Sequence, residues 1–204
     1  MKRLADQRWT FQGFSDHLVS EAIYLADPDE NGIELYCDRP KEQWKLMNGQ
    51  IVMATEPLDV DNLMEELGKP EQPGDKQLSA IDIGHVHLHV ADLAQVENFY
   101  HQMLGFDITQ RSYPGALFLS AGGYHHHIGT NIWAGKGAPA PPKNAVGLLS
   151  FRISVPDRYT VEIIRNRLEH SGVETTIKND GGAMPVLVTH DYDGTGVEIS
   201  ADYE

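Results

Sequence analysis

The sequence predicts an α+β fold in which one module, with the order strand, helix and three strands (βαβββ), is repeated. Two internal matches support this prediction. The run LADPDENGIEL (25–35) matches THDYDGTGVEI (189–199), and the run IGHVHLHVADL (83–93) matches LLSFRISVPD (148–157). Because self-similar segments indicate a repeated supersecondary unit, the stretches between them can be assigned to positions in the module.

One complete module is expected from Ile83 onward. The alternating run HVHLHV predicts its opening strand, and the helical spacing of apolar residues in 94–105, closed by Gly105, predicts its helix. Gly and Pro signals separate three short runs that predict the remaining strands, at 106–110, 116–120 and 125–133. The stretch 134–145 is rich in Pro and Gly, so it is expected to be a connection.

A second complete module is expected from Gly147. Its strand, helix and three further strands are predicted in the same order, at 148–155, 161–172, 173–178, 185–190 and 197–200. The run DYDGTG before its last strand, like the matching DPDENG, lacks the full twelve-residue pattern of a calcium loop, so both are expected to be turns. The two complete modules predict one domain over residues 81–204.

The N-terminal part matches the module only from its middle onward. Residues 1–7 predict the end of a module helix, and the second, third and fourth strands are expected at 9–14, 20–27 and 32–38. The opening strand is missing, and we expect it to precede Met1 in a longer form of the protein. The predicted organisation is a partial module with a connector (1–67), a polar linker (68–80) and the complete domain. The connector is expected to contain a short helix at 60–67.

Composition narrows the class of partner. A formal charge of -14 and a pI near 5.0 argue against nucleic acid and anionic membranes, which require clustered Lys and Arg. The single cysteine, Cys37, excludes an intramolecular disulfide, and the chain shows no signal peptide and no apolar run of membrane-spanning length. We therefore expect a cytoplasmic protein that binds a small molecule. The partial module leaves strand edges uncovered, which predicts a homo-oligomer.

The modules carry a family resemblance. The βαβββ order, the opening GHVHLHVADL and the closing DPDxNGIEL resemble the vicinal oxygen chelate superfamily, and GYHHHIGTNIWAG is similar to its bacterial catechol 2,3-dioxygenase and glyoxalase-like branch. The resemblance covers nearly the whole chain. It implies half-barrel mixed sheets around a metal-binding cavity, in which two histidines and one carboxylate hold Fe(II), or alternatively Mn(II) or another divalent metal.

The module from Ile83 resembles the first partner of an extradiol catalytic pair. His85, seven residues before Asp92, occupies the position of a metal ligand on the opening strand. The three consecutive histidines that follow Tyr124 cover the catalytic position on the fourth strand. The His-x-Ile-Gly pattern favours His126, whereas the opposite parity of Ile128 and Ile132 favours His127, so both stay candidates.

The N-terminal partial module resembles the second partner. His17, Tyr24 and Glu34 match the second-strand histidine, the third-strand tyrosine and the fourth-strand carboxylate that the resemblance implies. His17 and Tyr24 would orient the substrate oxygens by hydrogen bonds. Glu34 would be the carboxylate ligand of the metal.

Two arrangements of the metal site stay open. In the first, the partial module pairs with the module from Ile83, the metal takes His85 and Glu34, and the second histidine ligand lies on the opening strand expected before Met1. In the second, the site lies within the complete domain and uses His85, one of His126 and His127, and Glu198. His85 belongs to both arrangements.

These residues predict an extradiol ring-cleaving dioxygenase that acts on a small aromatic diol and dioxygen. Two alternatives are kept. A glyoxalase-like lyase or isomerase would use the same metal without consuming oxygen, and a non-catalytic binding protein would be a remnant of the same superfamily. His87 and His89 are expected to pack or to form hydrogen bonds in their strand without binding metal.

Overall fold

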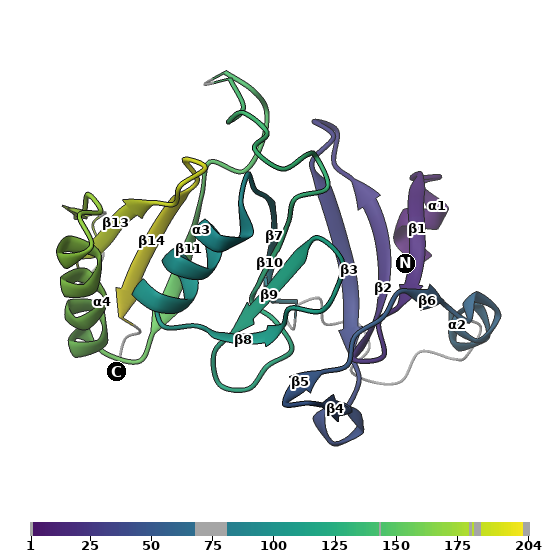
Figure 1. The fold of residues 1–204 in the computed structure, drawn as a ribbon. Coiled ribbons are helices and arrows are strands. Elements are labelled where there is room, and N and C mark those ends of the chain that lie inside the picture. Colours follow the sequence, from purple (N-terminus) through teal and green to yellow (C-terminus); the bar gives the residue numbers. More distant parts are fainter. Residues whose placement is uncertain (1, 68–80, 143, 180, 182–184, 202–204) are drawn as a thin grey trace. The chain divides into compact units, whose positions relative to one another are not determined.

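The computed structural model of the chain describes residues 2–67, 81–142, 144–179, 181 and 185–201 (Figure 1). It contains two compact units, Met1–Gly84 and His85–Glu204. The predicted linker, residues 68–80, lies outside the described residues. None of the helices in the described residues combines the length and the apolar character that a membrane crossing requires.

The first unit contains the predicted end of a helix and three strands. These elements are α1 (Lys2–Asp6), β1 (Phe11–Asp16), β2 (Ser20–Ala26) and β3 (Gly32–Asp38). Together with the short strand β6 (Glu56–Pro57), the three strands form a four-stranded antiparallel sheet in the order β3-β2-β1-β6. The connector carries η1 (Lys41–Gln43), β4 (Leu46–Met47), β5 (Gln50–Ile51) and the predicted helix, α2 (Val60–Leu67).

The second unit contains two complete modules with one topology. The first module comprises β7 (Val86–His89), α3 (Leu93–Val96) continued by the π-helical η3 (Glu97–Met103), β8 (Asp107–Gln110), β9 (Ala116–Ser120) and β10 (Ile128–Asn131). The second comprises β11 (Ser150–Val155), α4 (Arg158–His170), β12 (Thr176–Lys178), β13 (Val186–His190) and β14 (Gly196–Ala201).

Each of these modules places its opening strand beside its last strand. The sheet orders are β7-β10-β9-β8 and β11-β14-β13-β12, and in each sheet the first pair is parallel and the others are antiparallel. The shared order confirms the predicted α+β fold of repeated βαβββ modules.

The repeated sequence positions have a structural reason. Asp92 and Asp157 cap the helices of their modules, because the Asp92 side chain accepts hydrogen bonds from two backbone N–H groups of the first helical turn and the Asp157 side chain accepts from one. Asp27 and Asp191 organise the turns before β3 and β14, where one oxygen of each accepts from the N–H groups of the second and fourth residues that follow. The acidic runs are therefore turns, as predicted.

One predicted strand is shorter than expected. Strand β10 begins at Ile128, so the three histidines precede it rather than lie within it. The carbonyl of His125 accepts a hydrogen bond from Thr109 Oγ1 at 2.7 Å, whereas the amide of His127 bonds to the carbonyl of Leu119 at 2.9 Å. The chain therefore joins the backbone ladder only at His127.

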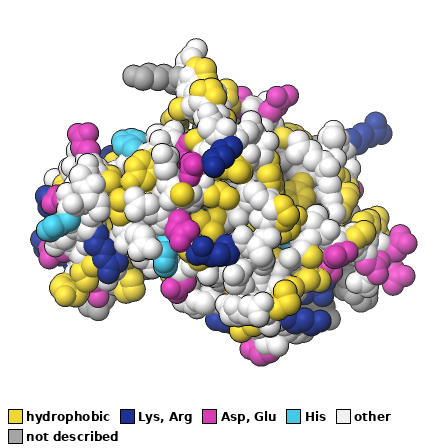
Figure 2. All heavy atoms as spheres, in the orientation of Figure 1, with side chains coloured by type: hydrophobic (Ala, Val, Ile, Leu, Met, Phe, Trp, Pro, Cys, Tyr) yellow, Lys and Arg dark blue, Asp and Glu magenta, His cyan; other side chains and the backbone are white. Residues whose placement is uncertain are grey.

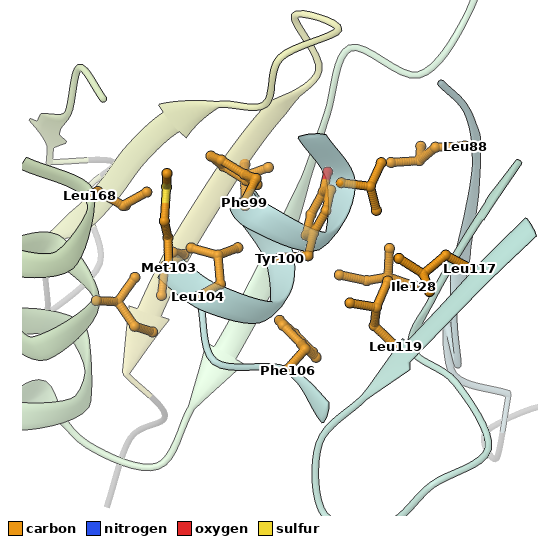
Figure 3. Close-up of a cluster of buried hydrophobic side chains, with 14 of the residues drawn as sticks. Leu88, Phe99, Tyr100, Met103, Leu104, Phe106, Leu117, Leu119, Ile128 and Leu168 are labelled. Atoms are coloured by element: carbon orange, nitrogen blue, oxygen red, sulfur yellow. The ribbon is translucent and has the colours of Figure 1, made fainter. Parts of the chain in front are cut away.

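Among the described residues of the second unit, one apolar core cluster joins the two modules. Phe99, Tyr100 and Met103 of η3 pack among side chains of both sheets and of α4, as Figure 3 shows for Leu117, Leu119, Ile128 and Leu168. Each such side chain, when fully buried, contributes roughly 1.5–3 kcal/mol to folding. The core covers one face of each sheet and leaves the opposite face for other contacts.

The exposed surface carries mixed charge. Figure 2 shows that on the face in view the Lys and Arg side chains are scattered among acidic and apolar ones and form no single patch. Leu148 and Leu149, which precede β11, are both exposed. The predicted self-association stays a prediction.

The turn before β14 is tied to the first module by a buried hydrogen bond. The Tyr100 hydroxyl donates to Asp191 Oδ2 at 2.8 Å, and burial raises the pKa of both groups above their ordinary values. A second bond between the same segments is exposed, from Asn98 Nδ2 to the Tyr192 hydroxyl at 2.9 Å. The two bonds allow a matched comparison of buried and exposed hydroxyl groups.

We expect Tyr100→Phe to lower the free energy of unfolding by about 1–3 kcal/mol, because the substitution leaves a buried carboxylate oxygen without its hydroxyl donor. Tyr192→Phe removes the exposed bond and should cost less than about 0.5 kcal/mol. Urea unfolding of both variants measures the difference. Equal stability losses in the two variants would show that the buried bond has no special role.

Candidate functional site

The face of the β7-β10-β9-β8 sheet opposite the apolar core carries histidines of the first complete module. Leu88 and Val90 point into the core, so His87 and His89 project from the opposite face by strand alternation. His85 immediately precedes β7. Its imidazole packs against that of His126, with ring centroids 4.3 Å apart. The structure therefore brings two of the predicted site residues together.

His126 is a buried side chain at this face. Its ring also lies edge-on to Phe118, at 5.0 Å between centroids, and its Nδ1 shares a hydrogen bond with His125 Nδ1 at 2.8 Å. Sequence reasoning treated the three histidines as alternatives for one position, so it missed that His125 and His126 form a pair. The sequence shows the two histidines as neighbours, but neighbours on a strand point to opposite faces. Their rings meet because both residues precede β10.

His127 has different partners. Its Nδ1 lies 3.0 Å from Ser120 Oγ and accepts from the amide of Ala121 at 3.2 Å. Burial lowers the pKa of His127, and the nearby His85 adds to this effect. The imidazole of His127 is therefore biased toward its neutral form and is held by groups at the end of β9.

His87 is held within the sheet. Its ring lies over Gly129, where an added Cβ would approach His87 Nδ1 to 3.1 Å, and its Nε2 lies 3.0 Å from Asn131 Nδ2. The rings of Phe118 and Trp133 lie 5.9 Å from it. Gly129 thus leaves the space that the imidazole fills, and His87 packs and hydrogen-bonds as the sequence predicted.

His17, Tyr24 and Glu34 converge in the first unit. His17 Nε2 lies 2.5 Å from the Tyr24 hydroxyl and 4.0 Å from Glu34 Oε1. Tyr24 and Glu34 are direct cross-strand partners on β2 and β3, which places their side chains on the same face. All three side chains are partly buried. Three residues predicted from separate strands therefore form one cluster.

The orientation of His17 fixes the direction of its hydrogen bonds. His17 Nδ1 lies 2.7 Å from the carbonyl oxygen of Ala54, and a carbonyl can only accept, so Nδ1 carries a proton. In the neutral imidazole, Nε2 is then an acceptor and the Tyr24 hydroxyl donates to it. The sequence pattern gave no sign of Ala54, because its contribution comes from the backbone.

Glu198 occupies the position in the last module that Glu34 occupies in the first unit, but its surroundings differ. Arg152 binds its Oε2 through Nη2 at 2.6 Å and through Nε at 3.0 Å, and Lys178 Nζ lies 3.3 Å from Oε1. Hydrogen bonding from Arg152 is the main cause that holds the pKa of Glu198 below its ordinary value. Val188 stands opposite Glu198 in register, where Tyr24 stands opposite Glu34.

Within the first unit, His17 lies with Tyr24 and Glu34. Within the second unit, His85 lies with His126, and Glu198 lies with two cations. In the part of the chain that the structure describes, no three His, Cys, Asp or Glu side chains are grouped closely enough to hold a metal ion. The donor types are nevertheless those of a non-haem iron site, because imidazole nitrogen and carboxylate oxygen are both present in partly buried positions.

Comparison with known proteins agrees with the fold. The family model described as "Glyoxalase/Bleomycin resistance protein/Dioxygenase superfamily" matches residues 82–200, which is more than half of the chain. A solved glyoxylase/bleomycin resistance protein/dioxygenase domain from Frankia sp. EAN1pec is 22% identical, with a TM-score of 0.50 over 63% of this chain and 95% of that one. A lactoylglutathione lyase from Agrobacterium tumefaciens is 21% identical, with a TM-score of 0.47 over 62% of this chain and 96% of that one.

One curated relative is closer in sequence. A protein named catechol-2,3-dioxygenase from Bacillus subtilis (strain 168) is 49% identical over 166 residues, which cover 78% of this chain and 56% of that protein. The chain therefore spans little more than half the length of this relative. On the match of the family model and on the repeated βαβββ modules, the chain belongs to the glyoxalase/bleomycin resistance protein/dioxygenase superfamily.

Proposed function

We propose that the chain acts in extradiol ring cleavage of a catechol-type substrate, with Fe(II), or alternatively Mn(II), as its metal. The observation that carries this proposal is the cluster of His17, Tyr24 and Glu34, which joins a proton-accepting histidine, a phenol and a carboxylate. The name and the 49% identity of the catechol-2,3-dioxygenase relative support the same reaction class. The reaction adds both atoms of dioxygen to the ring and breaks one carbon–carbon bond beside the diol.

We propose His85, in the second unit, and Glu34, in the first, as metal-ligating side chains. Their sequence positions within the modules support this assignment, and their imidazole and carboxylate donors suit a divalent first-row metal. When bound, such an ion would polarise both oxygens of the diol and bring the substrate together with dioxygen. Glu198 is a weaker candidate, because Arg152 and Lys178 already neutralise its charge.

Tyr24 and His17 are proposed to move a proton away from the substrate. A catechol must lose a proton from a hydroxyl group before its oxygen becomes strongly electron-donating. The Tyr24 oxygen can accept that proton as its own passes to His17 Nε2, over the 2.5 Å contact between them. The Ala54 carbonyl holds the proton on Nδ1, so Nε2 is the nitrogen of His17 that accepts the proton from Tyr24.

His126 is proposed as the second acid–base group, in preference to His127. It packs against His85, whereas His127 is engaged by Ser120 and Ala121 at the end of β9. A histidine beside the reacting atoms can stabilise negative charge on reduced oxygen or return a proton to the product.

The equivalent carboxylates of two modules provide a matched test of the ligand assignment. We expect Glu34→Gln to weaken iron binding by at least about tenfold, because the amide lacks the negative charge of the ligand. Glu198→Gln should leave iron affinity within about twofold of the unaltered chain, because its carboxylate serves a salt-bridge network. Anaerobic titration with ferrous iron measures both. Loss of iron affinity only in the Glu198 variant would show that Glu198, and not Glu34, is the carboxylate ligand.

The proposed function is tested directly with the protein, ferrous iron and a panel of catechols in an oxygen electrode. We expect uptake of one oxygen molecule per catechol consumed, together with a yellow ring-opened product. A reaction of dicarbonyl adducts without oxygen uptake would instead favour a lyase or isomerase. Absence of oxygen uptake with every catechol, in a protein that binds iron, would reject ring cleavage.

A further inference from the structure

We propose that His125 is a positioning residue that holds His126 in one tautomer and one ring orientation. The inference rests on the proposed function, in which His126 acts at the reacting atoms. His125 was only one member of the histidine run in the sequence, and no role in the mechanism above depends on it. The contact between the two imidazoles gives it a role of its own.

The pair is buried and close. His125 is 1% exposed and His126 is 9% exposed, and their Nδ1 atoms lie 2.8 Å apart. A hydrogen bond between two imidazole nitrogens holds a single proton, so one Nδ1 must donate and the other must accept. Two neutral rings in this contact are therefore locked in complementary tautomers. Proton transfer at His126 then takes place at Nε2. The hydrogen bond at Nδ1 decides whether Nε2 carries a proton in the neutral ring.

His125 is itself fixed from several sides. Its carbonyl accepts from Thr109 Oγ1 at 2.7 Å, which anchors the backbone before β10. The Tyr124 ring packs against its imidazole in a tilted arrangement, with 4.1 Å between centroids and an angle of 40° between the planes. The imidazole of His85 lies 6.5 Å away in an edge-on arrangement. A ring held in this way can orient its neighbour, as outer-shell partners of metal ligands and catalytic histidines do.

Two substitutions separate positioning from simple packing. In His125→Asn the amide stands where Nδ1 stood and can still donate or accept, whereas His125→Leu fills a similar volume without a hydrogen bond. We expect the Leu variant to lose about 10- to 100-fold in kcat with little change in KM, and the Asn variant to lose less than about tenfold. If His125 only fills space, the order reverses, with Leu active and Asn impaired, and the proposal is overturned.

A measurement on the metal-free protein gives a second readout. Multiple-bond nitrogen–proton NMR spectra, at a pH where both rings are neutral, report which nitrogen of His126 carries the proton. We expect one tautomer in the unaltered chain and a mixture in His125→Leu, with His125→Asn close to the unaltered chain. Mixed tautomers in the unaltered chain would overturn the proposal without any variant. If the chain cleaves no catechol, the proposed function fails, while these spectra still decide whether His125 orders His126.

Discussion

Replacing His85 with alanine is expected to leave the reconstituted protein almost without iron and to lower its ring-cleavage activity more than about a hundredfold, beyond the loss typical of an outer-shell partner. His85 is the ligand position that both sequence arrangements share, and its ring packs against His126 at the start of β7. Alanine removes the nitrogen donor but retains the backbone amide and carbonyl groups that continue into the strand.

The matched control is His89→Ala, which lies on β7 and on the same face as His87. His89 is exposed and is expected not to bind metal, so its replacement should leave iron content near that of the unaltered chain. Iron content is measured by elemental analysis after anaerobic reconstitution and removal of unbound metal. Full iron content in the His85 variant, or equal losses in both variants, would contradict the ligand assignment.

Replacing Tyr24 with phenylalanine is expected to lower kcat by about 10²- to 10⁴-fold while iron content stays unchanged. The substitution removes only the phenolic hydroxyl group, which donates to His17 Nε2 in the proposed proton relay. The ring of Phe would keep the cross-strand contact with Glu34, so the fold of the sheet should survive. Steady-state kinetics with catechol, together with iron analysis, measures the two effects separately.

The proposed proton relay also predicts the kinetics of a His17 variant and of a double variant. His17→Gln should show a loss similar to that of Tyr24→Phe, because each substitution interrupts the same proton transfer. The double variant should lose little more than either single variant, since groups that act as a unit are strongly non-additive. Losses that multiply in the double variant would mean that Tyr24 and His17 act independently.

The elements of the fold were predictable because their signals are local. The alternation in HVHLHV, the helical spacing around Tyr100 and the acidic run before Glu34 each reflect contacts between near neighbours in the chain. The internal repeat gave further support to the predicted fold, because an Asp that caps a helix or organises a turn recurs at the same position of each module. Helix α2 was predicted at Val60–Leu67 and begins and ends there.

The details of the site depended on contacts between distant residues. The sequence predicts a last strand that includes the three histidines. In the structure the Thr109 hydroxyl donates to the carbonyl of His125, and strand β10 begins only at Ile128. The neutralisation of Glu198 comes from Arg152 on the parallel neighbour strand, which the sequence pattern did not single out. By contrast, the convergence of His17, Tyr24 and Glu34 agreed with the sequence, because hairpin register brings successive strands of one module together.

We propose that this chain supports insertion of both atoms of dioxygen into a catechol. The most direct measurement supplies the iron-loaded protein with catechol under oxygen-18 gas, reduces the aldehyde product at once to prevent exchange with water, and records its mass. We expect both oxygen atoms added to the ring-opened product to carry the label. A ring-opened product that contains a single labelled oxygen, or none, would contradict dioxygenase activity of this chain.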